Sequence, residues 1–254
     1  MKNSKPLDDA GFCSEQVRVQ DGDRYLIALF QPKRIRRAAI ALAAWNLELS
    51  RARPRSGETT IGLMRLQWHR DALDEIAKGE PRRHPVIGEL AKACGAGLFD
   101  LDDLHTIINA RERDLDAAPM NNLDELEAYA RGTAGMLHGC LWRGTPAANV
   151  AMKAGTAFAL IGLARSESIN QARGRPWAPK AFRGGLRPIV ERAAGLARLE
   201  PVRRCKGAIV PAIIANGYIE RAIAAGSDPT KPKMAAADPG RLWRLIKARA
   251  RGQL

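Results

Sequence analysis

The sequence predicts an all-α protein, a helical bundle followed by a short basic helix at the C-terminus. Aromatic residues make up only 5% of the 254 residues, β-branched residues are few, and alanine, leucine and arginine are abundant. This composition favours helices over strands. Apolar residues recur at helical spacing in several segments, and no segment of useful length shows the alternation that is typical of a strand.

The first two predicted helices have apolar faces and clear ends. Residues 34–51 carry Trp45 among alanines and leucines, and Pro54 follows them. Residues 59–78 carry a broad apolar face, and Gly79 follows as a stop signal. Each segment is therefore predicted to pack one face against a core.

The middle of the chain continues this pattern after a proline-containing turn at 81–85. Residues 86–93 predict a third helix, and residues 101–115 predict a fourth with a buried stripe of leucine and isoleucine. The cap-like Asn122, followed by acidic residues, starts a fifth helix that continues toward Trp142.

Residues 146–165 are nearly all small and apolar, so they predict the central, fully buried helix of the bundle. A tight loop is expected at 174–179, where glycine and two prolines occur. Helices at 189–199 and 209–225 then complete the bundle.

We expect the chain to divide into four parts, and the sequence shows no internal repeat. The parts are an N-terminal segment (1–20), a helical domain (21–225), a proline-rich linker (226–240) and a basic terminal helix (241–254).

The net charge is strongly positive and unevenly placed. It amounts to 41 − 27 = +14, and residues 182–254, with 15 Lys and Arg against 5 Asp and Glu, supply +10 of it. Either a solvated arginine-rich surface or an acidic partner surface explains this excess, the candidate partners being anionic lipid, nucleic acid and an acidic protein. Nucleic-acid binding is not expected, because no DNA or RNA motif occurs and aromatic residues do not interleave with the cations.

Several site chemistries are excluded by the sequence. The four cysteines and four histidines form no Cys-x-x-Cys pair and no His-x-x-x-His spacing, and nucleophile-elbow, Walker and dinucleotide motifs do not occur. The longest apolar stretches, 38–45 and 154–164, are shorter than the ~20 residues that span a bilayer, and residues 1–20 do not resemble a signal peptide. The sequence therefore predicts no metal site and a cytoplasmic location with reduced thiols.

Several motifs follow one another in a familiar order. They are RLQWHRDAL at 65–73 with HPV at 84–86, the segment 104–115 with LDELEAYA at 123–130, the segment 155–165, and GRPWAP at 174–179. Together they resemble the squalene/phytoene synthases over residues 23–199. The resemblance implies an all-helical, isoprenoid-synthase-like fold and a reaction that joins two prenyl diphosphates head to head.

The resemblance also implies two Asp-x-x-x-Asp motifs on facing helices, whose carboxylates would hold Mg²⁺ and the diphosphate. In this chain the second motif falls on neutral side chains, and the first retains a single acid, one turn early. The matching positions are Glu48, Ser50, Arg51, Pro54, Ser166 and Asn170. Neutral oxygens cannot replace aspartates around a divalent cation, so we expect no catalytic residue and no cofactor, with Mg²⁺ relevant only if the chain is an enzyme.

Two cations remain where the family binds phosphate. Arg165 and Arg175 are candidate phosphate ligands, although Arg165 at a helix end also fits a simple interaction with the helix dipole. Asp114 and Asp116 are candidates for substitute ligands, but the favoured interpretation is that Asp114 forms ion pairs on the helix surface with Arg111 and Arg113.

One branch of the family fits better than the enzymes do. The segments AWNLEL at 44–49, ETTIGLMRLQW at 58–68 and RERDLD at 111–116 resemble the phytoene-synthase-like assembly factors of mitochondrial respiratory complex I, which are peripheral to the inner membrane. This resemblance implies a non-catalytic scaffold or lipid binder whose partner is a subunit of a membrane complex.

A prenyltransferase acting on isoprenoid diphosphates is the alternative function. An isoprenoid ligand would then occupy a central cavity lined by small and apolar residues, namely Ala157, Phe158, Leu160 and Ile161. The sequence leaves open whether that cavity is empty or filled by side chains.

The basic terminal helix is a candidate membrane contact. Arg241, Arg244 and Lys247 would meet anionic headgroups while Trp243 lies at the headgroup boundary. The other interpretation is an ordinary helix end that packs on the bundle. If the helix contacts the membrane, the protein would be cytoplasmic and peripheral on the inner membrane.

Overall fold

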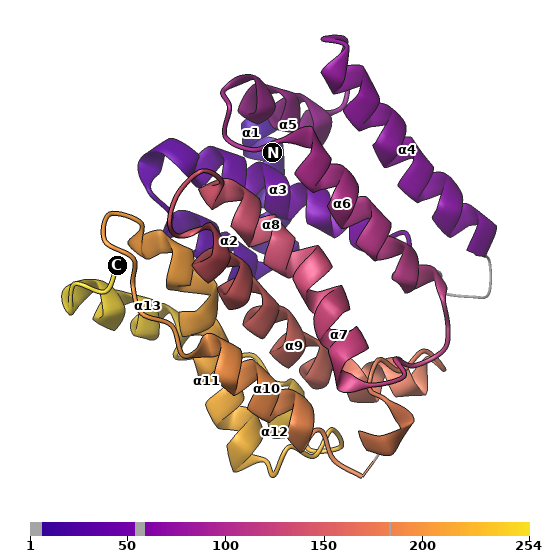
Figure 1. The fold of residues 1–254 in the computed structure, drawn as a ribbon, viewed down its shortest axis with the longest axis vertical. Coiled ribbons are helices and arrows are strands. Elements are labelled where there is room, and N and C mark those ends of the chain that lie inside the picture. The colour runs from indigo at the N-terminus through magenta and orange to yellow at the C-terminus, as the bar shows by residue number, and fades with distance from the viewer. Residues whose placement is uncertain (1–6, 54–58, 183) are drawn as a thin grey trace, which may run out of the picture.

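A computed structural model describes residues 7–53, 59–182 and 184–254, and these residues form helices and loops without a strand (Figure 1). The α-helices are α1 (Asp9–Gln20), α2 (Gly22–Leu29), α3 (Lys33–Ser50), α4 (Thr59–Ala77), α5 (Pro85–Gly95), α6 (Leu101–Arg111), α7 (Leu123–Ala130), α8 (Met136–Gly139), α9 (Ala148–Ala172), α10 (Arg187–Ala197), α11 (Val210–Ala224), α12 (Pro232–Ala235) and α13 (Arg241–Ala250). Shorter helical turns are η1 (Glu112–Leu115), η2 (Arg131–Gly135), η3 (Cys140–Trp142), η4 (Lys180–Phe182) and η5 (Lys206–Ile209). The predicted all-α class is confirmed.

Helices α1 and α2 were not predicted from the apolar pattern. Their buried faces are small, with only Cys13 and Val17 fully buried in α1. Both helices nevertheless begin at an N-cap aspartate, since Asp8 accepts a hydrogen bond from the amide of Gly11 and Asp21 accepts one from Arg24. The N-cap aspartates Asp8 and Asp21 are therefore the sequence features that could have predicted the starts of these two helices.

The fifth predicted helix is not regular. Between α7 and α8 the chain forms η2, a single π turn, and after α8 the helix tightens into η3, which ends at Trp142. A π turn adds one residue to the helix and turns the following side chains to new directions.

The predicted central helix is longer than expected and not buried all round. Helix α9 begins at Ala148 and extends to Ala172, because Glu167 and Asn170 in its last turns face inward and are buried. At its start Asn149 and Lys153 are exposed to solvent.

Two hydrophobic clusters form the core. One gathers around α3 and takes side chains from α1, α4, α5 and α6; the other gathers around α9 and takes side chains from α2, α7, α10 and α11. Helix α9 packs against α8 on one side and against α10 and α11 on the other, so it lies in the middle of the molecule (Figure 1). Trp45 is fully buried in the first cluster.

The terminal segments pack on the bundle. Helix α1 contacts α3 and α5, and α13 contacts α11 through the buried Leu245 and Ala248. The segment between α11 and α13 contains α12, whose Met234 is buried. The division of the chain into four parts stays a prediction.

Helix α9 approaches η2 closely at a glycine. A Cβ atom added at Gly155 would collide with the carbonyl oxygen of Ala134 and would lie 2.8 Å from the ring of His138. At Gly162, on the same helix, an added Cβ would meet nothing within 4 Å. These two glycines therefore differ in the space around them while sharing one helix.

Gly155→Ala is expected to lower the free energy of unfolding by about 1–3 kcal/mol, because the backbone of η2 must move away. Gly162→Ala is the matched control and should raise that free energy by up to about 1 kcal/mol through helix propensity alone. Chemical denaturation of both variants measures the difference. Equal effects of the two substitutions would contradict the close packing.

Candidate functional site

The two segments that the sequence analysis matched to metal-binding motifs meet in the structure. One is the end of α3 with the residues that follow it, and the other is the last part of α9. Nη1 of Arg53 donates a hydrogen bond to Oδ1 of Asn170 at 3.2 Å, which joins the two segments directly. Pro54 lies outside the described residues.

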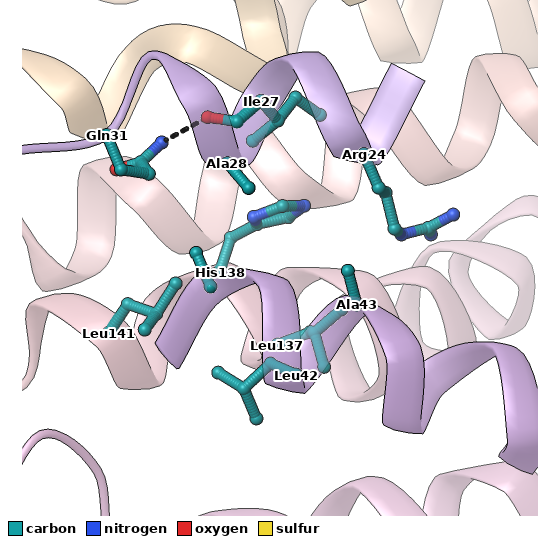
Figure 2. Close-up of a pocket in the computed structure, with 10 residues that line it drawn as sticks. Arg24, Ile27, Ala28, Gln31, Leu42, Ala43, Leu137, His138 and Leu141 are labelled. Atoms are coloured by element: carbon teal, nitrogen blue, oxygen red, sulfur yellow. Dashed lines mark hydrogen bonds between the residues drawn. The ribbon is translucent and has the colours of Figure 1, made fainter. Parts of the chain in front are cut away.

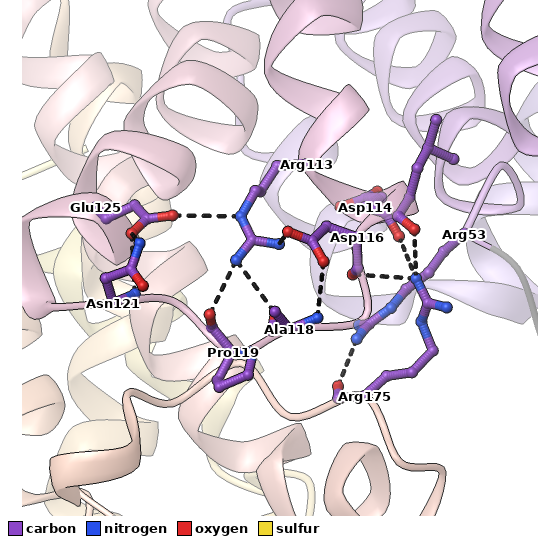
Figure 3. Close-up of polar contacts among 10 residues, drawn as sticks. Arg53, Arg113, Asp114, Asp116, Ala118, Pro119, Asn121, Glu125 and Arg175 are labelled. Carbon is purple, nitrogen blue, oxygen red and sulfur yellow. Dashed lines mark hydrogen bonds and ion pairs between the residues drawn. The ribbon is translucent and has the colours of Figure 1, made fainter. Parts of the chain in front are cut away.

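Arg53 is held firmly at this junction. Its Nη2 donates to the carbonyl oxygen of Arg175 at 2.6 Å (Figure 3). Its guanidinium lies over the ring of Trp177, 3.9 Å from the centroid. Burial lowers the pKa of Arg53 below its ordinary value, and nearby Asp114 acts in the opposite direction. Because an arginine pKa is so high, the side chain stays a cation at neutral pH. A fixed positive charge therefore lies between the two motif segments.

The hydroxyl groups of the motif positions are used within their own helices. Oγ of Ser50 donates to the carbonyl of Leu47 at 2.7 Å, and Oγ of Ser166 donates to that of Leu163 at 3.0 Å. Nδ2 of Asn170 donates to the carbonyl of Ser166 at 2.8 Å. Among these side-chain groups of Ser50, Ser166 and Asn170, the amide oxygen of Asn170 is not bonded within its helix, and it accepts the hydrogen bond from Arg53.

The two charged motif positions point to other partners. Oε1 of Glu48 lies 3.8 Å from Nε2 of His84, and burial raises the pKa of Glu48. Arg51 donates to Oε1 of Gln20 at 3.1 Å. Neither Glu48 nor Arg51 takes part in the contact between Arg53 and Asn170.

Magnesium requires hard anionic oxygens, and the described residues at the motif positions do not supply such a set. They offer helix-bonded hydroxyls, an occupied amide oxygen, a guanidinium and a single carboxylate, that of Glu48, which lies beside His84. In the part of the chain that the structure describes, no group of three or more His, Cys, Asp or Glu side chains could hold a metal ion.

The two candidate phosphate ligands lie apart and are bonded to the chain itself. Nη2 of Arg175 donates to the carbonyls of three successive residues, Asp114, Leu115 and Asp116, at 2.9–3.1 Å (Figure 3). The guanidinium of Arg165 lies 3.5 Å from the ring centroid of Tyr218 and donates to the carbonyl of Ala235. Arg175 thereby ties the 174–179 loop to η1.

Asp114 is buried, which corrects the expectation of an ion pair on the helix surface. It pairs with Arg111 as expected, but it also accepts a hydrogen bond of 2.5 Å from the hydroxyl of Tyr129, and its exposed fraction is 2%. Arg113 pairs instead with Asp116 and Glu125. The run of alternating charges resembles a solvated face, but one of its aspartates turns inward.

Arg111 completes a buried polar network with Asp114. It donates to the hydroxyl of Tyr129 at 3.1 Å and to Oδ1 of Asn46 on α3 at 2.6 Å. Burial lowers the pKa of Arg111, but its interactions with Tyr129 and Asp114 outweigh that effect and the pKa ends above its ordinary value. The network joins α3, α6, η1 and α7 around the motif site.

Glu167 is a second buried acid that the sequence analysis did not single out. Its Oε2 accepts hydrogen bonds from the amides of Trp177 and Ala178 at 2.9 and 3.1 Å. It therefore fixes the loop whose tryptophan stacks on Arg53. The signal in the sequence was an acid inside a helix of small apolar residues.

A small enclosed cavity lies between α2, α3 and α8 (Figure 2). Its volume of about 10 Å³ is close to the minimum that holds one water molecule. It is lined by apolar side chains together with Arg24, Gln31 and His138. Burial lowers the pKa of His138 to about 3, so this histidine is neutral. A cavity of this size cannot hold a prenyl chain.

The buried residues of α9 named as a cavity lining are packed within the second hydrophobic cluster. Among them, Phe158 contacts two of the residues around the small cavity. The guanidinium of Arg24 lies 5.2 Å from its ring centroid, and the ring of His138 meets it edge-on at 6.4 Å.

The four residues of α13 that were predicted as membrane contacts fall into two groups. Arg241 pairs with Asp23 at 3.0 Å and Arg244 pairs with Asp238 at 3.2 Å, so both face the bundle. Trp243 is 59% exposed, and Nζ of Lys247 lies 5.4 Å from its ring centroid. Among the described residues, no helix combines the length and the apolar character that crossing a membrane requires.

Comparison with known sequences identifies relatives for this chain. A family model described as squalene/phytoene synthase matches residues 17–182. The protein from Bos taurus named NADH dehydrogenase (ubiquinone) complex I, assembly factor 6 is 38% identical over 126 residues, and its Homo sapiens counterpart is 36% identical over 126 residues. Each match covers 50% of this chain and 38% of the relative, so the chain spans well under half the length of the curated relatives that it matches.

Solved structures show the same fold. A dehydrosqualene synthase in complex with ligand has a TM-score of 0.80 at 15% identity, covering 96% of both chains. The squalene synthase HpnC from Alicyclobacillus acidocaldarius has a TM-score of 0.57 at 20% identity, covering 96% of this chain and 94% of the other. The isoprenoid-synthase-like architecture is therefore confirmed. Since the family model matches well over half of its residues, the chain belongs to the squalene/phytoene synthase family.

Proposed function

We propose that this chain is a non-catalytic assembly factor for respiratory complex I that keeps the synthase fold and has lost both metal-binding motifs. The observation that carries the proposal is the guanidinium of Arg53, which bonds to Asn170 and Arg175 between the two motif segments. A positive charge fixed there repels Mg²⁺. The chain thus keeps the synthase fold without the metal site that prenyl transfer requires.

The names of the curated relatives support the assembly role. Proteins called complex I assembly factor 6 match this chain at 36–38% identity, whereas the two synthase structures are 15% and 20% identical. The partner would be a subunit of the membrane complex, recognised by a surface outside the motif site. Only 38% of each relative is matched, so the proposal concerns the part that the two share.

Deleting the gene in its own organism tests this role. We expect the amount of assembled NADH:quinone oxidoreductase, resolved on native gels, to fall and to return when the chain is supplied again. A second respiratory complex serves as the control and should stay constant. An unchanged amount of assembled complex I in the deletion strain would contradict the proposal.

We also propose that the chain is cytoplasmic and peripheral on the inner membrane, with α13 as the contact. Leu242, Trp243 and Ile246 are 42–59% exposed on this helix, and Lys247 lies beside Trp243. An exposed apolar strip next to cations suits the headgroup boundary of an anionic bilayer. Arg241 and Arg244 attach the opposite side of the helix to the bundle through ion pairs with Asp23, Glu220 and Asp238.

Replacing Trp243 and Ile246 with serine is expected to lower recovery with anionic vesicles in a flotation assay by several-fold, because both side chains lose apolar contact with lipid. The matched control replaces Ile61 and Met64, which are exposed on α4, with serine. Equal recovery of the two double variants would contradict a membrane contact through α13.

A prenyltransferase acting on isoprenoid diphosphates is the second candidate function. The fold shared with a dehydrosqualene synthase over 96% of the chain favours it. It would require Arg53, Arg165 or Arg175 to release their present partners and bind diphosphate, and it would require Mg²⁺ at positions whose donors do not suit it. These requirements place it second.

A further inference from the structure

The first turns of α3 concentrate positive charge where a helix least favours it. Lys33, Arg34, Arg36 and Arg37 are four of the first five residues, the first turn has no acid, and Pro32 provides no side-chain cap. The N-terminus of a helix carries the positive end of its dipole, so cations there are destabilising. Arg37 is compensated by Glu89 on α5, but Lys33 and Arg36 have no such ion pair among the described residues, and an uncompensated cost of this kind is typical of a functional position.

A groove runs beside this cationic turn, between α1, α3 and α5. Its volume is about 300 Å³, which is at the lower end for small-molecule sites. Ala10, Cys13, Ile40 and Ala41 form an apolar floor, and Lys33, Arg36 and Arg37 lie along the groove with Glu89. An apolar floor with a cationic rim matches a molecule that has an apolar tail and an anionic head.

The acids around the groove are already neutralised. Glu89 is buried and receives two hydrogen bonds from Arg37, at 2.5 and 2.8 Å, and one from Lys92 at 2.8 Å. Asp9 lies 3.7 Å from Lys92, and Asp8 caps α1. The charge of Arg37 is therefore balanced within the protein.

Arg36 and Lys33 differ from Arg37 in this respect. Arg36 donates one hydrogen bond, to the carbonyl of Gln31 at 3.3 Å, and its Nε is buried without a partner. Among the described residues, neither Arg36 nor Lys33 forms an ion pair with an acid. Two positive charges at the groove thus lack a counterion.

We propose that this groove binds a single-chain anionic amphiphile, with its carboxylate or phosphate head at Arg36 and Lys33 and its tail along the apolar floor. The site is separate from the motif site. Ile40 precedes Ser50 by ten residues of α3, which places it roughly 15 Å away along the helix. The proposal goes beyond the assembly role and does not depend on it.

Calorimetric titration of the purified chain with decanoate, below the concentration at which decanoate forms micelles, tests the site. We expect saturable binding of one decanoate per chain, binding of decyl phosphate at the same place by competition, and no saturable binding of decanol. Using a free amphiphile rather than vesicles separates this site from any membrane contact of α13.

Two variants in one helix turn test whether the anionic head of decanoate binds to the cations of the groove or is attracted by the positive charge of the helix end as a whole. Arg36→Gln should weaken decanoate binding by at least tenfold, whereas Arg34→Gln, which removes the same charge from an exposed position outside the groove, should change it less than threefold. Ala10→Trp fills the groove without removing a cation and should abolish binding. Circular dichroism confirms that each variant is folded.

The proposal would be overturned by absence of saturable decanoate binding, or by decanol binding as tightly as decanoate. Equal weakening by Arg34→Gln and Arg36→Gln would also overturn it, since long-range charge would then explain the effect. Unchanged binding by a folded Ala10→Trp variant would place the ligand elsewhere.

Discussion

Replacing Asp114 with alanine is expected to lower the free energy of unfolding by about 3–5 kcal/mol. Asp114 is 2% exposed and is the acid that balances the buried guanidinium of Arg111. Without it, Arg111 would stay buried with only neutral partners, the hydroxyl of Tyr129 and the amide oxygen of Asn46. An uncompensated buried charge is far more costly than a lost ion pair at the surface.

Asp116→Ala is the matched control for this prediction. Asp116 lies two residues away, its side chain is 56% exposed, and it pairs with Arg113 and accepts a hydrogen bond from the amide of Ala118. Its loss should cost about 1 kcal/mol or less. Urea unfolding of both variants, followed by circular dichroism, gives the comparison. Similar losses for the two would show that Asp114 is not the partner on which the network depends.

The second large effect is a loss of stability in mild acid. Burial lowers the pKa of His69 to about 4 and that of His138 to about 3, while both would titrate near 6.5 in the unfolded chain. Between these values the unfolded chain binds protons that the folded chain excludes. Stability is therefore present above pH 6.5 and is lost as the pH falls toward 4.

Each of these histidines should make the free energy of unfolding fall by up to about 1.4 kcal/mol per pH unit within that window. Glu48 acts in the opposite direction, because burial raises its pKa and protonation then favours the folded state. Glu89 adds to the loss at lower pH, since its hydrogen bonds with Arg37 hold its pKa below its usual value. The net result between pH 6.5 and 4.5 is a decrease of a few kcal/mol.

His69→Phe isolates one histidine in this window. His69 packs edge-on against Trp68 and Trp45, and its Nδ1 is buried without a hydrogen-bond partner, so a phenyl ring can take its place. Denaturation measured from pH 7 to 4.5 should give a shallower slope by about one proton. His105→Phe, at a half-buried surface position on α6, is the control. A slope that His69→Phe leaves unchanged would contradict the origin proposed for the acid sensitivity.

The helical core could be predicted because the spacing of apolar residues within each segment indicates which helices are buried. Trp45 among alanines and the small apolar residues around Gly155 predict buried helices. The structure buries most of α3 and the middle of α9, while the start of α9 is partly exposed. The boundaries of α9 were missed because Glu167 and Asn170 look like surface residues until their partners are known. These partners are the amides of Trp177 and Ala178 for Glu167 and the guanidinium of Arg53 for Asn170.

The candidate site was only partly predictable for the same reason. The motif positions near Ser50 and Asn170 were expected to face one another, and Arg53 joins these segments. The contacts of Arg53 with Trp177 and Arg175 connect residues more than 120 positions apart, and no local pattern encodes them. The ion pair between Arg241 on α13 and Asp23 on α2 likewise joins elements that are far apart in the sequence.

The most direct measurement of whether the fold has kept its chemistry is the release of pyrophosphate by the purified chain, given prenyl diphosphates and Mg²⁺. With Arg53 fixed between the motif segments and no suitable ligand set for Mg²⁺ among the described residues there, we expect no release above a blank without protein, under conditions where a dehydrosqualene synthase is active. Release that increases with protein concentration, saturates with substrate and requires Mg²⁺ would contradict the proposed loss of catalysis.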